Sequence, residues 1–235
     1  MASTVIKNWD NKTWLSSKNY IESFNKFVTK KVKLNSKSRI LDIGCGRGKI
    51  LGTLSSKLNL KNKPLGIDII NHKDKDKRIL FKQNNIFSFL LKNKKKFDLI
   101  LIKQTIHLLN LKEINRLLHL SKKNLSQTGK IFIFNLDTDN NEIPTFKLMK
   151  TKLFKSLKRD KKIIKLITKL YPYKKTRFNF NVKILKNKYL KMIQQRYIST
   201  LLPMTNSQIK KGLDEIKHKY KSYIKFKDKL ICLTL

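Results

Sequence analysis

The sequence contains few cysteines, histidines and acidic residues, and it has no long apolar run. Two cysteines and four histidines in 235 residues give neither a disulfide framework nor a metal-ligand spacing, so we expect no metal and a reducing compartment. No stretch approaches the roughly 20 apolar residues of a membrane span, and the first residues lack the apolar core of a signal peptide. We therefore expect a soluble, cytoplasmic protein without a membrane span.

The shortage of acidic residues leaves a large positive charge. Against 15 acidic residues stand 55 lysines and arginines, a net charge of +40. Such a charge alone would indicate RNA or an acidic membrane as partner. Only seven of the basic residues are arginine, however, and the chain is rich in lysine, asparagine and isoleucine, which share A/T-rich codons. Because nucleic-acid readers rely on arginine and interleaved aromatics, we favour compositional drift in an AT-rich genome over a nucleic-acid partner.

Glycine is also scarce, yet three of the seven glycines fall at Gly44, Gly46 and Gly48. They follow an apolar segment, residues 40–43, that is typical of a buried parallel strand, and they precede a helical pattern from residue 49. Glycines here let the backbone turn and approach a ligand closely. The spacing differs from the G-x-G-x-x-G of dinucleotide sites, and Asp42 would repel a phosphate but attract an ammonium group. The pattern predicts a ligand with a cationic amine.

This pattern, D-x-G-x-G-x-G after a strand, resembles the first motif of the class I S-adenosylmethionine (SAM) dependent methyltransferases, with a likeness to methyltransferase type 11. The resemblance continues in order through a strand ending at Asp68, through residues 97–109, which look like F-D-L-I-x-x-x-x-x-h-H-h-h, and through a strand at residues 129–135. It spans about residues 36–136. It implies an α/β fold with a doubly wound, seven-stranded, mostly parallel sheet and a helical lid inserted after the fifth strand.

The resemblance also implies SAM as cofactor and roles for individual residues. Asp42 and the glycines would hold the amino acid portion of SAM, and Asp68 would accept hydrogen bonds from both ribose hydroxyls. Asn85 stands where the family usually has an aspartate that accepts from the adenine amino group, and its amide oxygen can still accept that bond. The expected cofactor-binding residues are Asp42, Gly44, Cys45, Gly46, Gly48, Asp68, Asn85, Ile86 and Lys103.

Two residues are candidates for contact with the acceptor of the methyl group. His107 falls just past the fourth strand, at the edge where doubly wound sheets bind ligands, so it is a candidate general base, although it could simply orient a neighbour. Arg196 lies in the segment Arg-Tyr-Ile-Ser-Thr-Leu, which is similar to one seen in some small-molecule methyltransferases. Its planar fork suits a substrate carboxylate or phosphate, and the alternative is a structural salt bridge.

We expect one domain over residues 1–235, with an N-terminal helical cover (1–35), a SAM-binding core (36–136), and a lid with the rest of the sheet (137–235). Trp9, Trp14 and Tyr20 would either cover the SAM pocket or simply pack the first helix down. Residues 144–170 predict one broken basic amphipathic helix that caps a pocket rather than lying on a membrane. Residues 205–208 predict a capping box, and residues 224–235 a terminal antiparallel strand, whose partner is either 178–184 or 197–201.

Two functions remain open from the sequence. The first is SAM-dependent methyl transfer to a small molecule, at O, N or C, with Arg196 reading an anionic group. The second is RNA methylation on the basic surface. The absence of an N-P-P-Y motif, the lack of an appended RNA-binding module and the scarcity of arginine favour the first. A SAM-binding protein without turnover is a weaker third reading, and the oligomeric state is not predicted.

Overall fold

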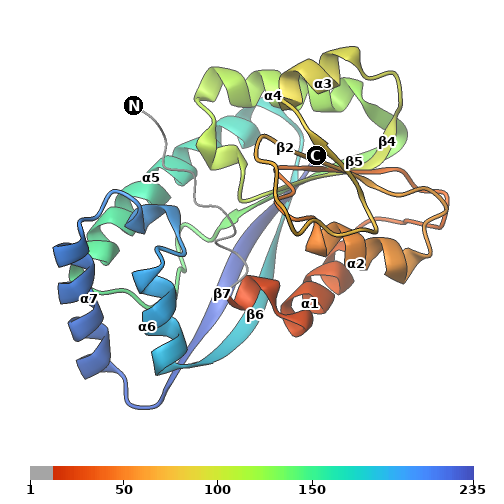
Figure 1. The fold of residues 1–235 in the computed structure, drawn as a ribbon. Helices are drawn as coiled ribbons and strands as arrows, with labels where there is room; N and C mark the ends of the chain where they lie inside the picture. Colours follow the sequence, from red (N-terminus) through yellow and green to blue (C-terminus); the bar gives the residue numbers. More distant parts are fainter. Residues whose placement is uncertain (1–12) are drawn as a thin grey trace.

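A seven-stranded sheet organises residues 13–235, the part of the chain that the computed structural model describes (Figure 1). The strand order is β3-β2-β1-β4-β5-β7-β6; the first five strands in this order pair in parallel, and β7 runs antiparallel to both β5 and β6. This confirms the predicted fold class. The strands are β1 (Ile40–Ile43), β2 (Leu65–Asp68), β3 (Leu80–Gln83), β4 (Phe97–Lys103), β5 (Leu125–Leu136), β6 (Lys174–Leu185) and β7 (Tyr223–Thr234).

Helices cover both faces of the sheet, because β1 and β4 are apolar on both sides. One apolar cluster lies between the sheet and helices α1 and α2, and a second lies under α3 and α4 on the opposite face. The helix α5 follows β5 and contributes to both clusters, which confirms a helical insertion after the fifth strand. The helices are α1 (Lys18–Thr29), α2 (Lys49–Leu58), α3 (Ile86–Lys92), α4 (Leu111–Lys123), α5 (Lys147–Leu170), α6 (Lys186–Gln194) and α7 (Asn206–Lys219), with single 3-10 turns η2 (Trp14–Ser16), η3 (Ile106–Leu108) and η4 (Ser199–Leu201).

The β6–β7 hairpin projects beyond the parallel part of the sheet. The last pair between β5 and β7 is Leu136 with Leu230, whereas β6 and β7 stay paired as far as Leu185 with Tyr223. At about 3.4 Å per residue the free part, residues 179–185 and 223–229, extends roughly 20 Å past the end of β5. We call this part the arm. It begins at the carboxyl edge of the parallel strands, where this class of sheet binds ligands.

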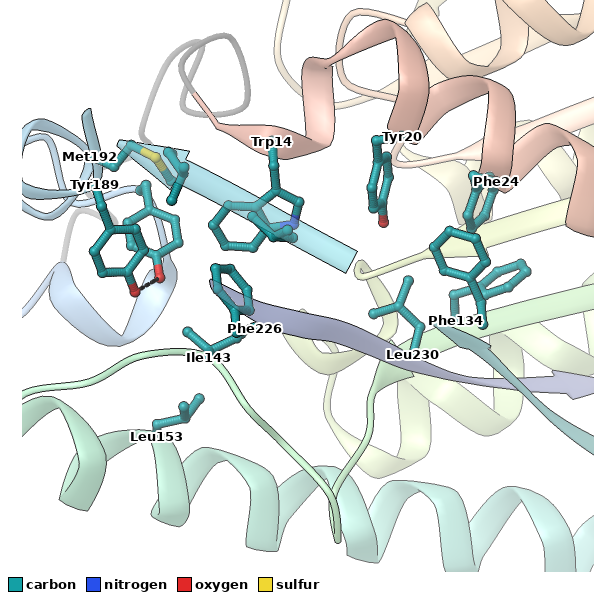
Figure 2. Packing of buried hydrophobic residues seen from close by; sticks show 14 of the residues in the cluster. Trp14, Tyr20, Phe24, Phe134, Ile143, Leu153, Tyr189, Met192, Phe226 and Leu230 are labelled. Atoms are coloured by element: carbon teal, nitrogen blue, oxygen red, sulfur yellow. Dashed lines mark hydrogen bonds between the residues drawn. The ribbon is translucent and has the colours of Figure 1, made fainter. Parts of the chain in front are cut away.

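The N-terminal segment is packed against the arm through aromatic rings. The Trp14 ring contacts Tyr197 and Phe226 edge-on, at centroid distances of 5.6 and 5.0 Å. The Tyr20 ring packs in the same way on Phe178 and Phe180. Figure 2 shows the Trp14 and Tyr20 rings projecting from this segment toward β7. The packing alternative for Trp14 and Tyr20 is therefore confirmed, while Trp9 lies outside the described residues.

Several sequence expectations can be checked on the outer elements. The capping box at Thr205 and Gln208 is confirmed, and a second one joins Asn110 to Glu113. The strand paired with β7 is β6, so the alternative at residues 197–201 is wrong: Ser199–Leu201 form η4. The sequence predicted a broken helix over residues 144–170, and the break is also wrong. Helix α5 runs without interruption from Lys147 to Leu170 because no proline or glycine falls inside it.

No helix among residues 13–235 is both long enough and apolar enough to cross a bilayer.

Candidate functional site

The glycine loop between β1 and α2 adopts the backbone that its sequence predicts. Gly44, Gly46 and Gly48 have φ angles of +71°, +54° and +70°, a left-handed region that other residues enter at a cost. A Cβ atom on Gly44 would meet the Thr105 side chain at 2.3 Å, and one on Gly48 would meet Ile79 at 2.1 Å. A Cβ atom on Gly46 would have nothing within 4 Å. The loop is thus packed from behind at two glycines and open at the middle one.

The Asp68 carboxylate at the end of β2 is tied to this loop. Its Oδ2 accepts a hydrogen bond from the Gly46 N–H at 2.8 Å, and its Oδ1 accepts one from the Ile70 N–H at 2.9 Å. Asp68 therefore lies at the glycine loop, and its contact with the ribose stays a prediction. Each oxygen keeps a further lone pair for a ligand hydroxyl.

Cys45 shapes the glycine loop, and its role in cofactor binding stays a prediction. Its side chain packs toward β2, since a Cβ atom on Gly66 would lie 2.7 Å from the Cys45 Sγ. Burial raises the pKa of the Cys45 thiol well above its usual value, with smaller contributions from Asp42 and Asp68. The thiol is therefore protonated, and the backbone of Cys45, whose N–H donates to Ile67 O at 3.2 Å, shapes the loop.

Asn85 has a structural role that the sequence did not predict. It is the N-cap of α3: its Oδ1 accepts from the Phe87 and Ser88 N–H groups at 2.9 and 3.4 Å. The amide oxygen expected to meet adenine thus already satisfies the start of a helix. The Ile86 N–H, at the first position of α3, has no acceptor within the helix and is directed out of its end. The adenine contacts of Asn85 and Ile86 stay predictions.

Asp42 is a buried carboxylate at the edge, with an exposed fraction of 6%. Burial raises its pKa to about 7; the Lys103 charge opposes this shift and the Asp68 charge adds to it. Lys103, at the end of the neighbouring strand β4, lies beneath α1: its Nζ is 5.4 Å from the centroid of the Tyr20 ring and 5.6 Å from that of Phe24. The site therefore combines two carboxylates with one ammonium that is held on aromatic faces.

A third carboxylate, Asp228 on β7, completes this charged group and was missed from the sequence. Its exposed fraction is 1%, and its Oδ2 accepts a 3.0 Å hydrogen bond from Trp14 Nε1. Burial raises the pKa of Asp228, while Trp14, Lys103 and Tyr20 oppose the shift. The sequence did contain a signal for Asp228. It is a charged residue at a position of the terminal strand where the alternate, inward-facing residues are apolar: Ile224, Phe226, Leu230 and Cys232.

The two candidate acceptor contacts have different surroundings. His107 lies in η3, shortly after β4; burial and, to a smaller extent, the Arg159 charge lower its pKa to about 4, so the ring is neutral at physiological pH. Arg196 has a φ of +53° and donates from Nη2 to Met204 O at 3.0 Å and to Asn206 Oδ1 at 2.8 Å. These bonds fix the loop between α6 and α7. The roles of His107 and Arg196 toward an acceptor stay predictions.

A cavity of about 360 Å³ lies beside the glycine loop, between the starts of α1 and α2. Its lining includes the Arg47 side chain from the loop itself, which pairs with Asp74 at 2.8 Å. Among residues 13–235 there is no cluster of three or more histidine, cysteine, aspartate or glutamate side chains arranged to hold a metal ion.

Comparison with known proteins agrees with this geometry. A family model described as a methyltransferase domain matches residues 34–197. Among solved structures, a putative methyltransferase from an antibiotic biosynthesis pathway of Anabaena variabilis superimposes with a TM-score of 0.61 at 15% identity, over 90% of this chain and 96% of that one. A SAM-dependent methyltransferase from Geobacter sulfurreducens, solved with S-adenosyl-L-homocysteine (SAH), gives 0.55 at 12% identity over 96% and 95%.

The plantazolicin methyltransferase BpumL, solved with a pentazolic desmethylPZN analog and SAH, gives a TM-score of 0.54 at 19% identity, over 97% of this chain and 87% of that one. No curated protein matches the chain. At these identities the structural likeness establishes the fold, and the family model extends over most of the chain, including the glycine loop and both neighbouring carboxylates.

Proposed function

The chain belongs to the methyltransferase domain family, and we propose that it is an enzyme that transfers the methyl group of SAM to a small molecule. The observation that carries this proposal is the loop at Gly46: it is open on the ligand side and bordered by the carboxylates of Asp42 and Asp68. A ligand that presents an ammonium group and a pair of hydroxyls fits that arrangement better than a phosphate does.

The residues of the edge fit SAM group by group. Asp42 offers a negative charge to the ammonium group, and the backbone around Gly46 can approach the amino acid portion closely. Asp68 has lone pairs for the ribose hydroxyls. The Ile86 N–H at the start of α3 is a donor for a ring nitrogen of adenine, and Asn85 holds that helix start in place. We keep Lys103 as a cofactor-site residue because its ammonium lies between Asp42 and α1.

SAM supplies a methyl group on a positively charged sulfur, and the chain must position the acceptor and exclude water. The N-terminal segment would help with the second task, because the rings of Trp14 and Tyr20 pack on Phe226 and Phe180 of the arm. For His107 we propose orientation of a neighbouring group, because a pKa near 4 leaves it a weak base at physiological pH.

Negatively charged side chains at the carboxyl edge of the sheet favour a small-molecule acceptor over RNA. Asp42 and Asp228 are both buried and both feel the Lys103 charge, and Asp68 adds to the negative charge at Asp42, so these carboxylates would repel a polyanionic backbone. BpumL, which has a similar fold, was solved with a desmethylPZN analog, and by analogy of fold this also favours a small-molecule acceptor.

The test uses the purified protein with SAH, followed by radiolabelled SAM in a cell extract. We expect heat of SAH binding in calorimetry and label in a small-molecule fraction that resists RNase. Absence of SAH binding by folded protein would refute the cofactor assignment. Label that disappears on RNase digestion would establish the RNA alternative, and SAH binding without any labelled product would indicate a binding protein without turnover.

A further inference from the structure

Helix α5 has two faces of opposite chemistry. The face toward the sheet is apolar apart from Asp160, and its buried side chains are Met149, Leu153, Leu157, Ile163 and Ile167. In Figure 2, Leu153 lies on the side of the helix that faces Ile143 and Phe226. The opposite face is exposed from the first turn to the last. Folding of the chain therefore uses the apolar face of α5 and leaves the other face available.

The exposed face of α5 is almost entirely cationic. Nine of its twelve exposed positions are basic and none is acidic. Within residues 13–235 a single ion pair involves a member of this set, Lys161 with Asp139 at 2.9 Å, so the other eight charges face solvent without a carboxylate partner. We call the nine residues the basic face: Lys147, Lys150, Lys155, Lys158, Arg159, Lys161, Lys162, Lys165 and Lys169.

Compositional drift does not account for the basic face. Drift toward A/T-rich codons adds asparagine as well as lysine, and the chain as a whole is rich in both. Helix α5 has ten basic residues among its 24 and no asparagine, whereas the whole chain has 55 basic residues among 235. The exposed positions of α7 show the expected mixture, with Asn206, Ser207, Gln208 and Glu215 beside lysines. The basic face is thus enriched beyond what drift supplies.

The helix presents these charges along a straight line. Because α5 is unbroken over 24 residues, its exposed side is about 36 Å long at 1.5 Å per residue. Residues three and four apart are neighbours on a helix surface, so positions 147, 151, 154, 158, 162, 165 and 169 follow one another along one side. Five of these seven are lysine. Charges arranged in this way can all meet a flat surface at once.

Phe154 lies in the same line and is the second feature of this face. Its side chain is 58% exposed and belongs to neither apolar cluster, although the adjacent Leu153 is buried in the first. The Lys158 Nζ lies 4.8 Å from the centroid of the Phe154 ring. Helices that bind anionic bilayers combine lysines that meet the headgroups with aromatic or leucine side chains that enter the acyl boundary.

We propose that the basic face and Phe154 form a docking surface for a bilayer that contains anionic phospholipids. The lysine charges lie against the headgroup phosphates, and the Phe154 ring enters the boundary of the acyl chains. The apolar face of α5 stays in the core of the protein, so binding requires no unfolding. This proposal goes beyond methyl transfer and does not depend on it.

A bilayer fits this surface better than RNA does. Eight of the nine residues of the basic face are lysine, and lysine is a compact point charge that suits headgroups, whereas RNA recognition favours the planar fork of arginine and stacked rings. The Lys158 ammonium lies over the Phe154 ring, where a base would have to stack. A straight row of charges also follows a flat surface along its whole length.

The experiment measures sedimentation of the purified full-length chain with vesicles at about 0.15 M salt. The vesicles are phosphatidylcholine alone or phosphatidylcholine with roughly one third phosphatidylserine. We expect binding to the anionic vesicles and none to the neutral ones. Lys158→Glu with Lys162→Glu and Lys165→Glu should weaken binding by about 100-fold, and glutamine at the same three positions by a smaller factor. Phe154→Ser should weaken it by about tenfold.

The matched control reverses three exposed lysines elsewhere, Lys57→Glu with Lys61→Glu and Lys63→Glu. These residues lie at the end of α2 and in the loop before β2, and they change the net charge of the chain by the same amount. Screening at this salt limits the effect of distant charges, so the control should bind anionic vesicles within about threefold of wild type. Circular dichroism checks that every variant is folded.

Each contrary result overturns the proposal. Failure of the wild-type chain to bind anionic vesicles, equal binding to neutral vesicles, or an equal loss in the control would do so. Unchanged binding in the lysine variants of α5 or in Phe154→Ser would do the same. RNA binding at this salt that the α5 reversals abolish, without vesicle binding by the wild-type chain, would identify RNA as the partner instead. Loss of SAH binding by the wild-type chain would refute the proposed function and leave the vesicle result unaffected.

Discussion

The Gly46 N–H and the Asp68 Oδ2 are joined by a 2.8 Å hydrogen bond, although Gly46 lies in the glycine loop and Asp68 ends strand β2, 22 positions later. The bond makes the glycine loop and the second strand one rigid unit before any ligand binds. Preorganisation of this kind lowers the cost of ordering the site on binding. Asp68 thus anchors the loop, in addition to the ribose contact that we propose for it.

Asp68→Ala should therefore weaken SAM binding by about 1 to 3 kcal/mol, the range for losing charged hydrogen bonds. Calorimetry with SAM and with SAH measures the loss. Asp139→Ala, which removes an exposed carboxylate paired with Lys161, is the control and should bind as the wild-type chain does. An unchanged affinity in Asp68→Ala would exclude Asp68 from the site.

Alanine substitutions at Gly46 and Gly48 should have different effects on stability and ligand binding. Gly46→Ala has room for its methyl group, so it should cost only about 1 to 2 kcal/mol of stability through the left-handed backbone, while the methyl group blocks the ligand side and lowers SAH affinity. Gly48→Ala adds a clash with Ile79 and should be the less stable variant. Urea denaturation and calorimetry measure the two effects. Equal SAH affinity in Gly46→Ala and wild type would show that the open side of the loop does not face the cofactor.

SAM affinity should depend on pH through Asp42. Its pKa is about 7 in the free protein, so the carboxyl is largely protonated below that value, and the incoming ammonium group favours the ionised form. Binding should then release protons below about pH 7, and affinity should rise with pH up to that value and level off above it. Calorimetry in two buffers of different ionisation enthalpy measures the release. Asp42→Asn should abolish it, and a pH-independent affinity in the wild-type chain would refute this role.

A second buried acid should affect stability rather than binding. Asp160 on α5 is 5% exposed, its Oδ1 has no hydrogen-bond partner among the described residues, and burial raises its pKa to about 6. The folded state therefore holds this proton more tightly than the unfolded state, so the wild-type chain loses stability as pH rises from about 4 to about 6 and stays lower above that.

Replacing Asp160 with leucine should stabilise the chain, because the neighbouring buried positions Leu157 and Ile163 are apolar. We expect a gain of about 1 to 3 kcal/mol at pH 8 and a smaller gain at pH 4, where the wild-type carboxyl is protonated. Urea denaturation at both pH values measures the difference. A loss of stability at pH 8 would show that Asp160 has a partner that compensates its burial.

The sequence correctly predicted the structural elements that are determined by residues close together in the chain. The strand at residues 40–43, the glycine loop and the capping box at Thr205 each depend on residues a few positions apart, and all three are present as expected. Asn85 shows why a family motif alone does not determine the role of a residue. Its side chain accepts a hydrogen bond at the start of α3, and the motif does not predict this helix cap.

The features that the sequence did not reveal depend on distant pairs. Asp228 meets Trp14 across 214 positions, and only the folding of the N-terminal segment onto the arm makes that contact visible. The choice of β6 as the partner of β7 likewise required the register of a long hairpin. Charge patterns along the chain give the net value of +40 but not the place where acidic residues gather.

The last prediction concerns the basic surface. If the lysines reflect composition, RNA should bind weakly at physiological salt, without sequence preference, and with a steep dependence on ionic strength, because such binding is driven by release of counterions. Methyl transfer should not depend on it. Reversal of two exposed lysines, Lys73→Glu with Lys77→Glu, should lower RNA binding at low salt and leave the labelling rate unchanged. Filter binding over a salt series and the radiolabel assay measure the two quantities. Labelling abolished by these reversals alone would show that the basic surface takes part in the reaction, and it would promote RNA to the acceptor.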